Sequence, residues 1–144
     1  AMVLWSYPRG TDISKEGETA IDVVTYAAQI ACQLGAHIVK VKLPSAHVEL
    51  KDAKKVYEKH HIPTETLTDR VRHVIESAFN GKRIVIFSGG PKSENDQAFF
   101  NEVRAIRDGG GFGSIIGRNS FQRQKAEGLT FLRTCMQIYA GEVK

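Results

Sequence analysis

Two patterns of apolar residues alternate along the chain, short continuous runs and residues spaced three or four positions apart. Short runs rich in apolar and β-branched residues lie at 2–6, 36–43, 83–88 and 112–116. They predict strands, and their nearly continuous apolar character is typical of strands buried in a parallel sheet. Between and after them, apolar residues recur every three or four positions, which predicts helices at 17–34, 65–79, 93–107 and 122–139. Strands that alternate with helices predict an α/β fold with a parallel sheet.

The apolar stripe of each expected helix predicts its buried face. Gly35 and the pair Asn80-Gly81 follow two of the stripes and are suited to end those helices in a left-handed conformation. Cys32 and Cys135 fall within the patterns and are interpreted as small core residues of a protein in the reducing cytoplasm. The predicted core faces are Ile21, Val24, Ala28, Ala31 and Leu34; Leu67, Val71, Val74, Ile75 and Ala78; Phe99, Val103 and Ile106; and Leu129, Leu132, Met136 and Tyr139.

Residues 44–64 interrupt the alternation of strands and helices. This segment is polar and lysine-rich, with a short helical pattern at 48–57, so we expect a helical insert on the rim of the sheet. The adjacent His60 and His61 point in different directions on any regular element, and no cysteine or carboxylate cluster completes a metal site around them. We therefore interpret this pair as solvated surface and expect no bound metal.

Composition narrows the class of ligand. The chain has 144 residues, enough for one domain, and a formal net charge of +4 that suits anionic ligands such as phosphate esters. No run of basic residues is interleaved with aromatic residues, so we expect no nucleic-acid partner. No apolar run approaches the roughly 20 residues of a membrane span, and no signal peptide is present, so we expect no membrane association.

The strand at 36–43 carries two lysines in an otherwise apolar run. Because side chains alternate along a strand, Lys40 and Lys42 point to the same side, together with Ile38. Burial and a neighbouring cation each disfavour the charged form, so the pKa of one lysine should fall. A neutral lysine amine is the nucleophile that forms Schiff bases with carbonyl compounds. The alternative is an edge strand with both lysines in solvent.

Two glycine-containing loops follow the last two strands. Ser88, Gly89 and Gly90 precede Pro91-Lys92-Ser93 and the start of a helix, where backbone N–H groups can approach an anion. Gly117 and Arg118 occupy the equivalent loop one strand later, and an arginine can bind phosphate through two N–H groups. We predict that both loops bind phosphate; the alternative is that the glycines only form tight turns. No Walker-type glycine-lysine motif is present, which disfavours a nucleoside triphosphate site.

Two architectures fit this order of elements, a doubly wound sheet or part of a (β/α)₈ barrel. In both, ligands bind at the carboxyl ends of the strands. Tyr7 and Arg9, the two lysines and both glycine loops all lie at such ends. A doubly wound nucleotide-binding domain would carry a Gly-x-Gly-x-x-Gly motif after its first strand, and residues 8–12 lack it.

Four motifs then resemble one family, the archaeal-type class I fructose-bisphosphate aldolases. They are residues 5–10 (Trp-Ser-Tyr-Pro-Arg-Gly), 37–42 (His-Ile-Val-Lys-Val-Lys), 88–92 (Ser-Gly-Gly-Pro-Lys) and 116–123 (Ile-Gly-Arg-Asn-Ser-Phe-Gln-Arg). The resemblance spans essentially the whole chain. It implies a (β/α)₈ barrel that cleaves fructose 1,6-bisphosphate to dihydroxyacetone phosphate and glyceraldehyde 3-phosphate without metal or other cofactor.

The resemblance also implies a role for each candidate residue. By motif position, Lys40 is the Schiff-base lysine, and Tyr7 donates and accepts the proton during carbon–carbon cleavage. Lys42 lies where a second cation could lower the pKa of Lys40, and Arg9 faces the sugar phosphate. The residues that would bind a substrate phosphate are Ser88, Gly89, Gly90, Gly117 and Arg118.

The chain supplies only four strands, which the resemblance identifies as strands five to eight of the barrel. Residues 1–144 are therefore expected to be the C-terminal half of a longer aldolase domain, although Ala1-Met2 could equally be a cloning remnant. Half a barrel leaves two open strand edges, so we expect a homo-oligomer and an inactive isolated fragment. The alternatives are a related Schiff-base or transaldolase-like enzyme for another phosphorylated sugar, and a non-catalytic sugar-phosphate-binding module.

Overall fold

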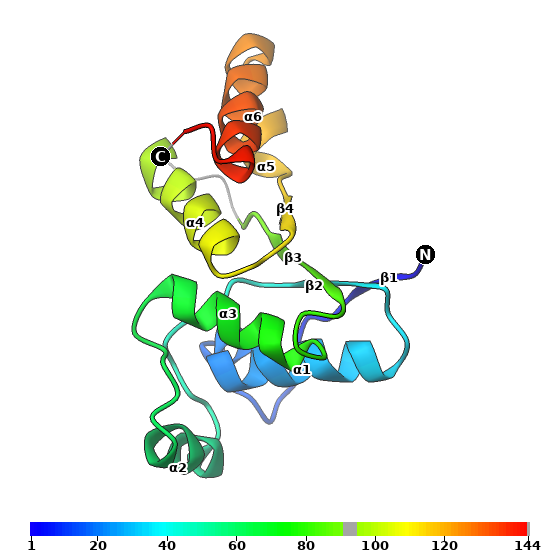
Figure 1. The fold of residues 1–144 in the computed structure, drawn as a ribbon, viewed down its shortest axis with the longest axis vertical. Coiled ribbons are helices and arrows are strands. Elements are labelled where there is room, and N and C mark those ends of the chain that lie inside the picture. Colours follow the sequence, from blue (N-terminus) through cyan, green and yellow to red (C-terminus); the bar gives the residue numbers. More distant parts are fainter. Residues whose placement is uncertain (91–94, 144) are drawn as a thin grey trace.

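Four short strands form one parallel sheet in the order β1-β2-β3-β4 (Figure 1). In this computed structural model, which describes residues 1–90 and 95–143, the strands are β1 (Val3–Trp5), β2 (Ile38–Val41), β3 (Ile84–Ser88) and β4 (Gly113–Ile115). Each strand pairs with the next along the chain, so the strand order does not reverse as it does in a doubly wound sheet. The prediction of a parallel α/β sheet is confirmed, and its strand order is that of a barrel segment.

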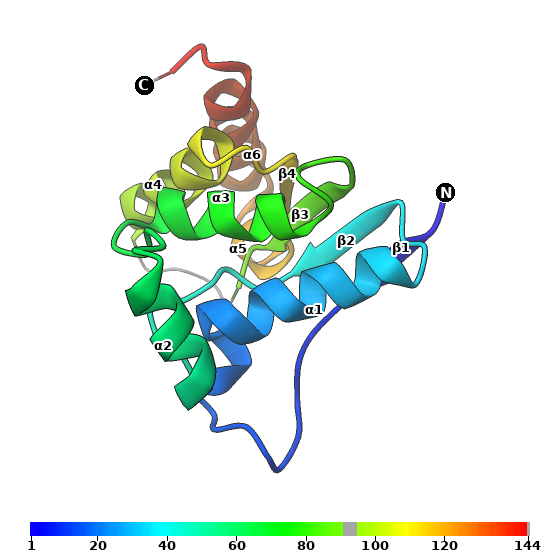
Figure 2. The same ribbon diagram turned by 60° about the horizontal axis from the view of Figure 1, so that its bottom comes forward.

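Helices connect the strands and cover one face of the sheet. Helices α1 and α3 lie side by side against the strands, and α4 packs next to α3 (Figure 2). The remaining helices are the rim insert α2, which confirms the expected helical insert, the short α5, and α6, which packs on α4. The bounds are η1 (Gly17–Thr19), α1 (Ile21–Gln33), α2 (Lys51–Lys59), α3 (Leu67–Ser77), α4 (Asp96–Asp108), α5 (Arg118–Phe121) and α6 (Lys125–Ala140).

The main core lies between the sheet and these helices. Alternate residues of the strands point into it, among them Val39, Val41 and Phe87, which are fully buried. The helices contribute the predicted stripes, with Val24 of α1 and Val74 of α3 also fully buried. Cys32 and Cys135 are free and buried, as expected. This packing fixes the positions at which the four strands end.

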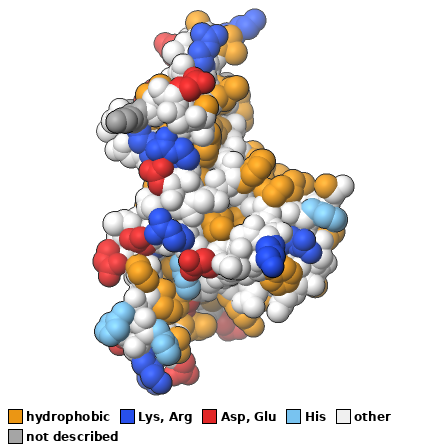
Figure 3. Space-filling view, in the orientation of Figure 1, with side chains coloured by type: hydrophobic (Ala, Val, Ile, Leu, Met, Phe, Trp, Pro, Cys, Tyr) orange, Lys and Arg blue, Asp and Glu red, His pale blue; other side chains and the backbone are white. Residues whose placement is uncertain are grey.

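The opposite face of the sheet is open over much of its area. Val3 and Trp5 of β1 are 48% and 63% exposed, and Ile84 of β3 and Ile115 of β4 are also exposed. Hydrophobic side chains are visible over β1 and β2 and along α6 on this side of the molecule (Figure 3). Within the described residues, no strand pairs with the outer edge of β1 or of β4. The structure therefore has the two open edges expected for half a barrel.

Three predicted core positions are wrong. Leu34, which follows α1, is 68% exposed, and on α6 Leu129 is 57% and Met136 70% exposed, whereas Leu132 is half-buried and Tyr139 packs against the core. Helix α6 instead buries the face formed by Phe131, Cys135 and Ile138, which packs on Phe99 and Val103 of α4. Both faces of α6 have apolar residues at helical spacing, and α4 covers only one of them.

The boundaries otherwise differ by a few residues. The segment 17–19, expected as the start of a long helix, is the separate turn η1, and the loop expected at Gly117 contains α5. Thr66 caps α3 by accepting a hydrogen bond from the amide of Asp69 at 3.1 Å. Gly35 and Gly81 have φ angles of 91° and 74°, in the left-handed region expected after these helices. Pro91, Lys92 and Ser93 lie outside the described residues.

Candidate functional site

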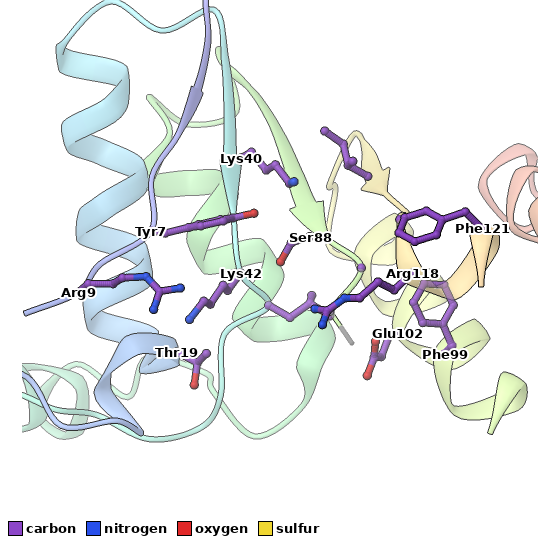
Figure 4. A pocket seen from close by; sticks show the side chains of 15 residues that line it. Tyr7, Arg9, Thr19, Lys40, Lys42, Ser88, Phe99, Glu102, Arg118 and Phe121 are labelled. Carbon is purple, nitrogen blue, oxygen red and sulfur yellow. The ribbon is translucent and has the colours of Figure 1, made fainter. Parts of the chain in front are cut away.

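A cavity of about 830 Å³ opens at the carboxyl ends of the strands. Its described lining includes every candidate residue of the sequence: Tyr7, Arg9, Lys40, Lys42, Ser88, Gly89, Gly90, Gly117 and Arg118. These residues come from four different strand ends and converge on the same space (Figure 4). The cavity has the size of a small-molecule site.

Lys40 lies near the middle of this arrangement. It projects from β2, which pairs with β1 and β3 on its two sides, so the edge-strand alternative is wrong. The residue is only 7% exposed, and its Nζ lies 4.1 Å from the ring centroid of Trp5 and 5.8 Å from that of Tyr7. Trp5 and Tyr7 stack with centroids 6.4 Å apart. The amine of Lys40 is therefore held against two aromatic rings at the end of β1.

Lys42 binds a carboxylate that the sequence analysis missed. Its Nζ lies 2.7 Å from Oε2 of Glu18, whose other oxygen accepts a hydrogen bond from Lys15 at 2.8 Å. Arg9 Nη1 lies 3.7 Å from the same Glu18 oxygen as Lys42. Hydrogen bonds from Lys15 and Lys42 lower the pKa of Glu18 to about 2. The positive charge of Lys42 is thus paired with Glu18, and Glu18 holds two cationic side chains of the cavity in place.

The two glycine loops are joined by a buried asparagine. Asn119 is 1% exposed, and its Nδ2 donates a hydrogen bond to the carbonyl of Gly89 at 2.8 Å. A Cβ at Gly89 would lie 3.2 Å from the carbonyl oxygen of Ile115, so the two loops approach each other closely at this glycine. Gly90 has a φ of 63°, which glycine adopts without strain. These glycines therefore both form turns and line the cavity.

Two backbone amides at the described start of α4 are bound by the side chain that caps the helix. Oδ1 of Asn95 accepts hydrogen bonds from the amides of Gln97 and Ala98 at 2.9 and 3.2 Å. Asp96 forms a two-fold ion pair with the guanidinium of Arg123, in which Nη1 and Oδ2 are 2.9 Å apart. The amides of Gln97 and Ala98 are thus engaged within the protein, and Arg118 and the described backbone of the two loops are candidates for phosphate contacts.

Two aromatic residues and one acid that the sequence did not mark as site residues line the cavity near Arg118. Arg118 points from the end of β4 back toward β2, and Glu102 of α4 lies beside it (Figure 4). Burial raises the pKa of the Glu102 carboxyl. Phe99 and Phe121 line the same side. Phe99 belongs to the predicted core face of α4 and is only 4% exposed. No local motif distinguishes Glu102 from other helical acids.

The charge of the lining favours an anion. Four basic side chains (Arg9, Lys40, Lys42 and Arg118) and one acidic side chain line the cavity among the described residues. An arginine and backbone amides in such a cavity can bind a phosphate ester, while a buried amine beside a phenol can react with a carbonyl group and move a proton. The arrangement therefore fits a phosphorylated carbonyl compound.

Other classes of site find no support in the described part of the chain. Its histidines, cysteines and acids form no group of three or more arranged to hold a metal ion. Among the described helices, none has both the length and the apolar character needed to cross a membrane.

The sequence of the chain matches a known family of aldolases. Residues 1–123 match the model of the DeoC/LacD family aldolases. The class 1 fructose-bisphosphate aldolase of Thermoproteus tenax is 33% identical over 143 residues, an alignment that covers 99% of this chain and 44% of that protein. The chain thus spans less than half the length of this relative, and the resemblance inferred from the four motifs is confirmed.

Solved structures agree with this match. The crystal structure of an archaeal fructose 1,6-bisphosphate aldolase superposes with a TM-score of 0.73 at 32% identity, over 96% of this chain and 44% of the other. A second archaeal aldolase structure, with its catalytic lysine bound covalently to the carbinolamine intermediate of the substrate, gives a TM-score of 0.71 at 30% identity, over 95% of this chain and 44% of the other. The fold is therefore that of part of such an aldolase, and the chain belongs to the DeoC/LacD family of aldolases.

Proposed function

We propose that these 144 residues carry the Schiff-base site of a class I fructose-bisphosphate aldolase, which cleaves fructose 1,6-bisphosphate reversibly to dihydroxyacetone phosphate and glyceraldehyde 3-phosphate. The observation that carries the proposal is the cavity itself, because all nine residues chosen from sequence line it. The family match supports the same reaction class. The four strands are assigned to the C-terminal half of the barrel, strands five to eight.

Lys40 is the proposed nucleophile. Its neutral amine attacks the ketone carbon of the substrate, and loss of water from the carbinolamine leaves a cationic iminium that accepts the electrons of the breaking bond. The position of Lys40 supports this role, because the residue is nearly buried while its side chain still lines the cavity. Trp5 lies against the amine at 4.1 Å and restricts its position.

Tyr7 is the proposed proton carrier. Its hydroxyl points into the cavity on the same side as Lys40 (Figure 4). During cleavage it takes the proton of the C4 hydroxyl as the C3–C4 bond breaks, and it can return a proton to the enamine carbon afterwards. Hydrolysis of the resulting iminium would then release dihydroxyacetone phosphate and regenerate the lysine amine.

The two loops at the other side of the cavity are the proposed phosphate site. Arg118 supplies the charge, and Ser88 with the backbone of Gly89, Gly90 and Gly117 supplies neutral contacts. Arg9 and Lys42, fixed by Glu18, are placed to meet the phosphate at the opposite end of the sugar. Anchoring both ends of the substrate would place its carbonyl carbon at Lys40.

The reaction belongs to glycolysis and, in the reverse direction, to gluconeogenesis, and we place the protein in the cytoplasm. Free Cys32 and Cys135 support a reducing compartment. A second candidate function is a Schiff-base aldolase or transaldolase-like reaction on another phosphorylated sugar, which the same cationic cavity would accommodate. A non-catalytic sugar-phosphate-binding module would need the cations but no reactive lysine.

The test is borohydride trapping with dihydroxyacetone phosphate, followed by peptide mass mapping. We expect a reduced adduct on Lys40, its loss in Lys40→Arg, and its retention in Lys55→Arg, an exposed lysine on α2 paired with Asp52. Dihydroxyacetone phosphate that binds to a folded chain without forming an adduct would identify a binding module and overturn the enzyme proposal. An adduct that forms more readily with other phosphorylated ketoses would support the second candidate.

A further inference from the structure

The loop between β1 and α1 carries residues of the cavity. It runs from residue 6 to residue 20 and contains the short turn η1. Tyr7 and Arg9 lie at its start and line the cavity. Glu18, which pairs with Lys42 and Arg9, lies in η1 near its end. Ordering a loop costs conformational entropy, so contacts from another part of the chain must offset this cost if Glu18 is to stay in place.

Glu49, which lies just before the rim helix α2, makes these contacts. Its Oε1 accepts a hydrogen bond from the amide of Ser14 at 2.6 Å, and its Oε2 accepts one from the hydroxyl of Ser14 at 2.8 Å. Nε2 of His47 lies 2.8 Å from the same Oε2. Hydrogen bonds from the Ser14 amide and from His47 lower the pKa of Glu49 to about 2. The Glu49 carboxylate is therefore charged at neutral pH and bound to the loop.

From Ser14 the contacts continue to Glu18. The amide of Gly17 donates a hydrogen bond to Oγ of Ser14 at 2.9 Å. A Cβ at Gly17 would lie 2.6 Å from Cδ of Glu49, so the carboxylate occupies the space that a side chain at this position would fill. Gly17 is the first residue of η1 and directly precedes Glu18. The side chain of Glu49 thus fixes the two positions that set the course of the loop into Glu18.

The backbone of Glu49 is anchored independently of its side chain. The buried carboxylate of Asp22 on α1 accepts hydrogen bonds from the amides of Glu49 at 3.0 Å and of Leu50 at 2.9 Å. The amide of Ser45 donates a hydrogen bond to the carbonyl of Thr19 at 2.7 Å. Removing the Glu49 side chain would therefore release the loop at Ser14 while the segment that carries residue 49 stays in place.

We propose that Glu49 is a positioning residue for the phosphate contacts of Arg9 and Lys42. Glu49 is not among the described residues that line the cavity, so it acts through Ser14 and Gly17 on Glu18. The inference rests on the proposed function, in which these two cations meet one phosphate of the sugar while Arg118 meets the other. When Glu49 holds the loop, both cations are in place before the substrate arrives, and less entropy is lost on binding.

The test compares ligands that carry one or two phosphates. Each variant is made in the natural chain that contains these residues, on a Lys40→Ala background in which sugar phosphates bind without reacting. Titration calorimetry gives the dissociation constants of fructose 1,6-bisphosphate and dihydroxyacetone phosphate. Glu49→Ala should weaken binding of the bisphosphate about ten-fold, the effect of one lost hydrogen bond to a charged group, and should change binding of dihydroxyacetone phosphate by less than about two-fold.

Gly17→Ala tests the same contact without changing any charge. The added methyl group would displace the carboxylate of Glu49 from Ser14, and the φ angle of Gly17 lies outside the left-handed region, so alanine fits the backbone. This variant should reproduce the selective loss of bisphosphate affinity. Glu58→Ala is the matched control, because it makes the same substitution at an exposed position of α2 and should alter neither dissociation constant.

A double variant tests whether Glu49 acts through Glu18. On a Glu18→Gln background, Glu49→Ala should produce no further loss of bisphosphate affinity, because the residue through which it acts is already changed. Circular dichroism verifies that each variant is folded.

Three results would overturn the role of Glu49: equal weakening of both ligands, a loss that persists on the Glu18→Gln background, or unchanged affinities in both Glu49→Ala and Gly17→Ala. Borohydride trapping on the protein with Lys40 intact tests the proposed function separately. A missing adduct there would overturn the aldolase reaction, whereas the comparison of affinities would still decide the role of Glu49.

Discussion

The side-chain amide of Asn119 donates a hydrogen bond to the carbonyl of Gly89 at 2.8 Å. Gly89 directly follows the end of β3, and Asn119 lies in the segment that follows β4, next to Arg118. This hydrogen bond therefore joins the segments that follow the two strands. Both loops line the cavity. The relative position of the two proposed phosphate-binding loops therefore depends on a residue that points away from solvent and has no direct access to a ligand.

Replacing this asparagine should weaken both folding and phosphate binding. In Asn119→Ala the partly buried carbonyl of Gly89 loses its donor, which costs about 1 kcal/mol of unfolding free energy. The loops would also lose their fixed separation, so the affinity for dihydroxyacetone phosphate should fall. Urea denaturation and calorimetric titration measure the two effects. Asn101→Ala, on the exposed surface of α4, is the control and should change neither quantity appreciably.

The stability of the chain should depend on Glu18 in a defined pH range. The folded pKa of Glu18 is about 2, below its ordinary value near 4.5, so its ionised form is favoured by folding. This contribution is fully present above pH 4.5 and is lost as the pH falls through 2. The difference in urea midpoint between the natural chain and Glu18→Gln should therefore be constant above pH 5 and should shrink between pH 4.5 and 2.

The neighbouring Glu16 provides the control for this experiment. Glu16 is exposed, and Glu16→Gln removes the same formal charge two residues away. Its urea midpoint should follow that of the natural chain across the whole pH range. Glu49, whose pKa is lowered to about 2 by hydrogen bonds from Ser14 and His47, titrates in all three proteins and cancels from the comparison. A pH-independent effect of Glu18→Gln would contradict a role for its charge.

The charge of Glu102 should affect the stability of the chain in the opposite direction from that of Glu18. Burial raises the pKa of its carboxyl, so ionisation of Glu102 disfavours the folded state. The penalty is absent below the ordinary pKa of a glutamate and is complete above the raised value. Glu102→Gln should therefore stabilise the chain at pH 7, and the gain should vanish by pH 4. Thermal melts at both pH values measure it, and a gain of equal size at pH 4 would indicate a packing effect instead of a charge effect.

The sequence predicted the elements that depend on local patterns. The apolar runs of the strands, the alternation that buries Val39 and exposes Lys40 to the cavity, and the glycines at strand ends are all set by neighbours in the chain. The parallel topology then brings the strand ends together, which is why every residue chosen at those ends lines one cavity. The resemblance to aldolases added the roles that the pattern alone left open.

What the sequence missed depends on distant contacts. Glu18 and Lys42 are separated by 24 positions, and nothing local marks Glu18 as the partner of a cavity lysine. On α6, Leu129 and Met136 lie on one apolar face and Phe131 and Cys135 on another, so periodicity alone could not decide which face α4 covers. In a half-barrel, some apolar residues lie on surfaces that the described fold leaves uncovered. An apolar stripe on a helix therefore predicts the core less reliably than in a complete domain.

Arg118 should dominate phosphate affinity if the two loops form the phosphate site. Hydrogen bonds to charged groups contribute about 1.5–3 kcal/mol, so Arg118→Ala should weaken binding of dihydroxyacetone phosphate about 10- to 100-fold. Arg118→Lys should restore part of this, because it keeps the charge but not the paired N–H groups. Titration calorimetry measures the affinity. Arg72→Ala, an ion-paired arginine of α3 outside the cavity, should leave it unchanged.

Tyr7→Phe separates the formation of the Schiff base from the cleavage of the carbon–carbon bond. The variant keeps the ring that stacks on Trp5 and lies 5.8 Å from the amine of Lys40, so adduct trapping should continue within about two-fold of the natural rate. Loss of the hydroxyl removes the proton acceptor for the C4 hydroxyl, and general base catalysis of this kind contributes about 10²- to 10⁴-fold. Cleavage of fructose 1,6-bisphosphate in an active assembly should fall by that factor. Because Tyr7→Leu would remove the ring as well, it should lower trapping too, and equal losses of trapping and cleavage in Tyr7→Phe would show that the hydroxyl positions Lys40 instead of carrying the proton.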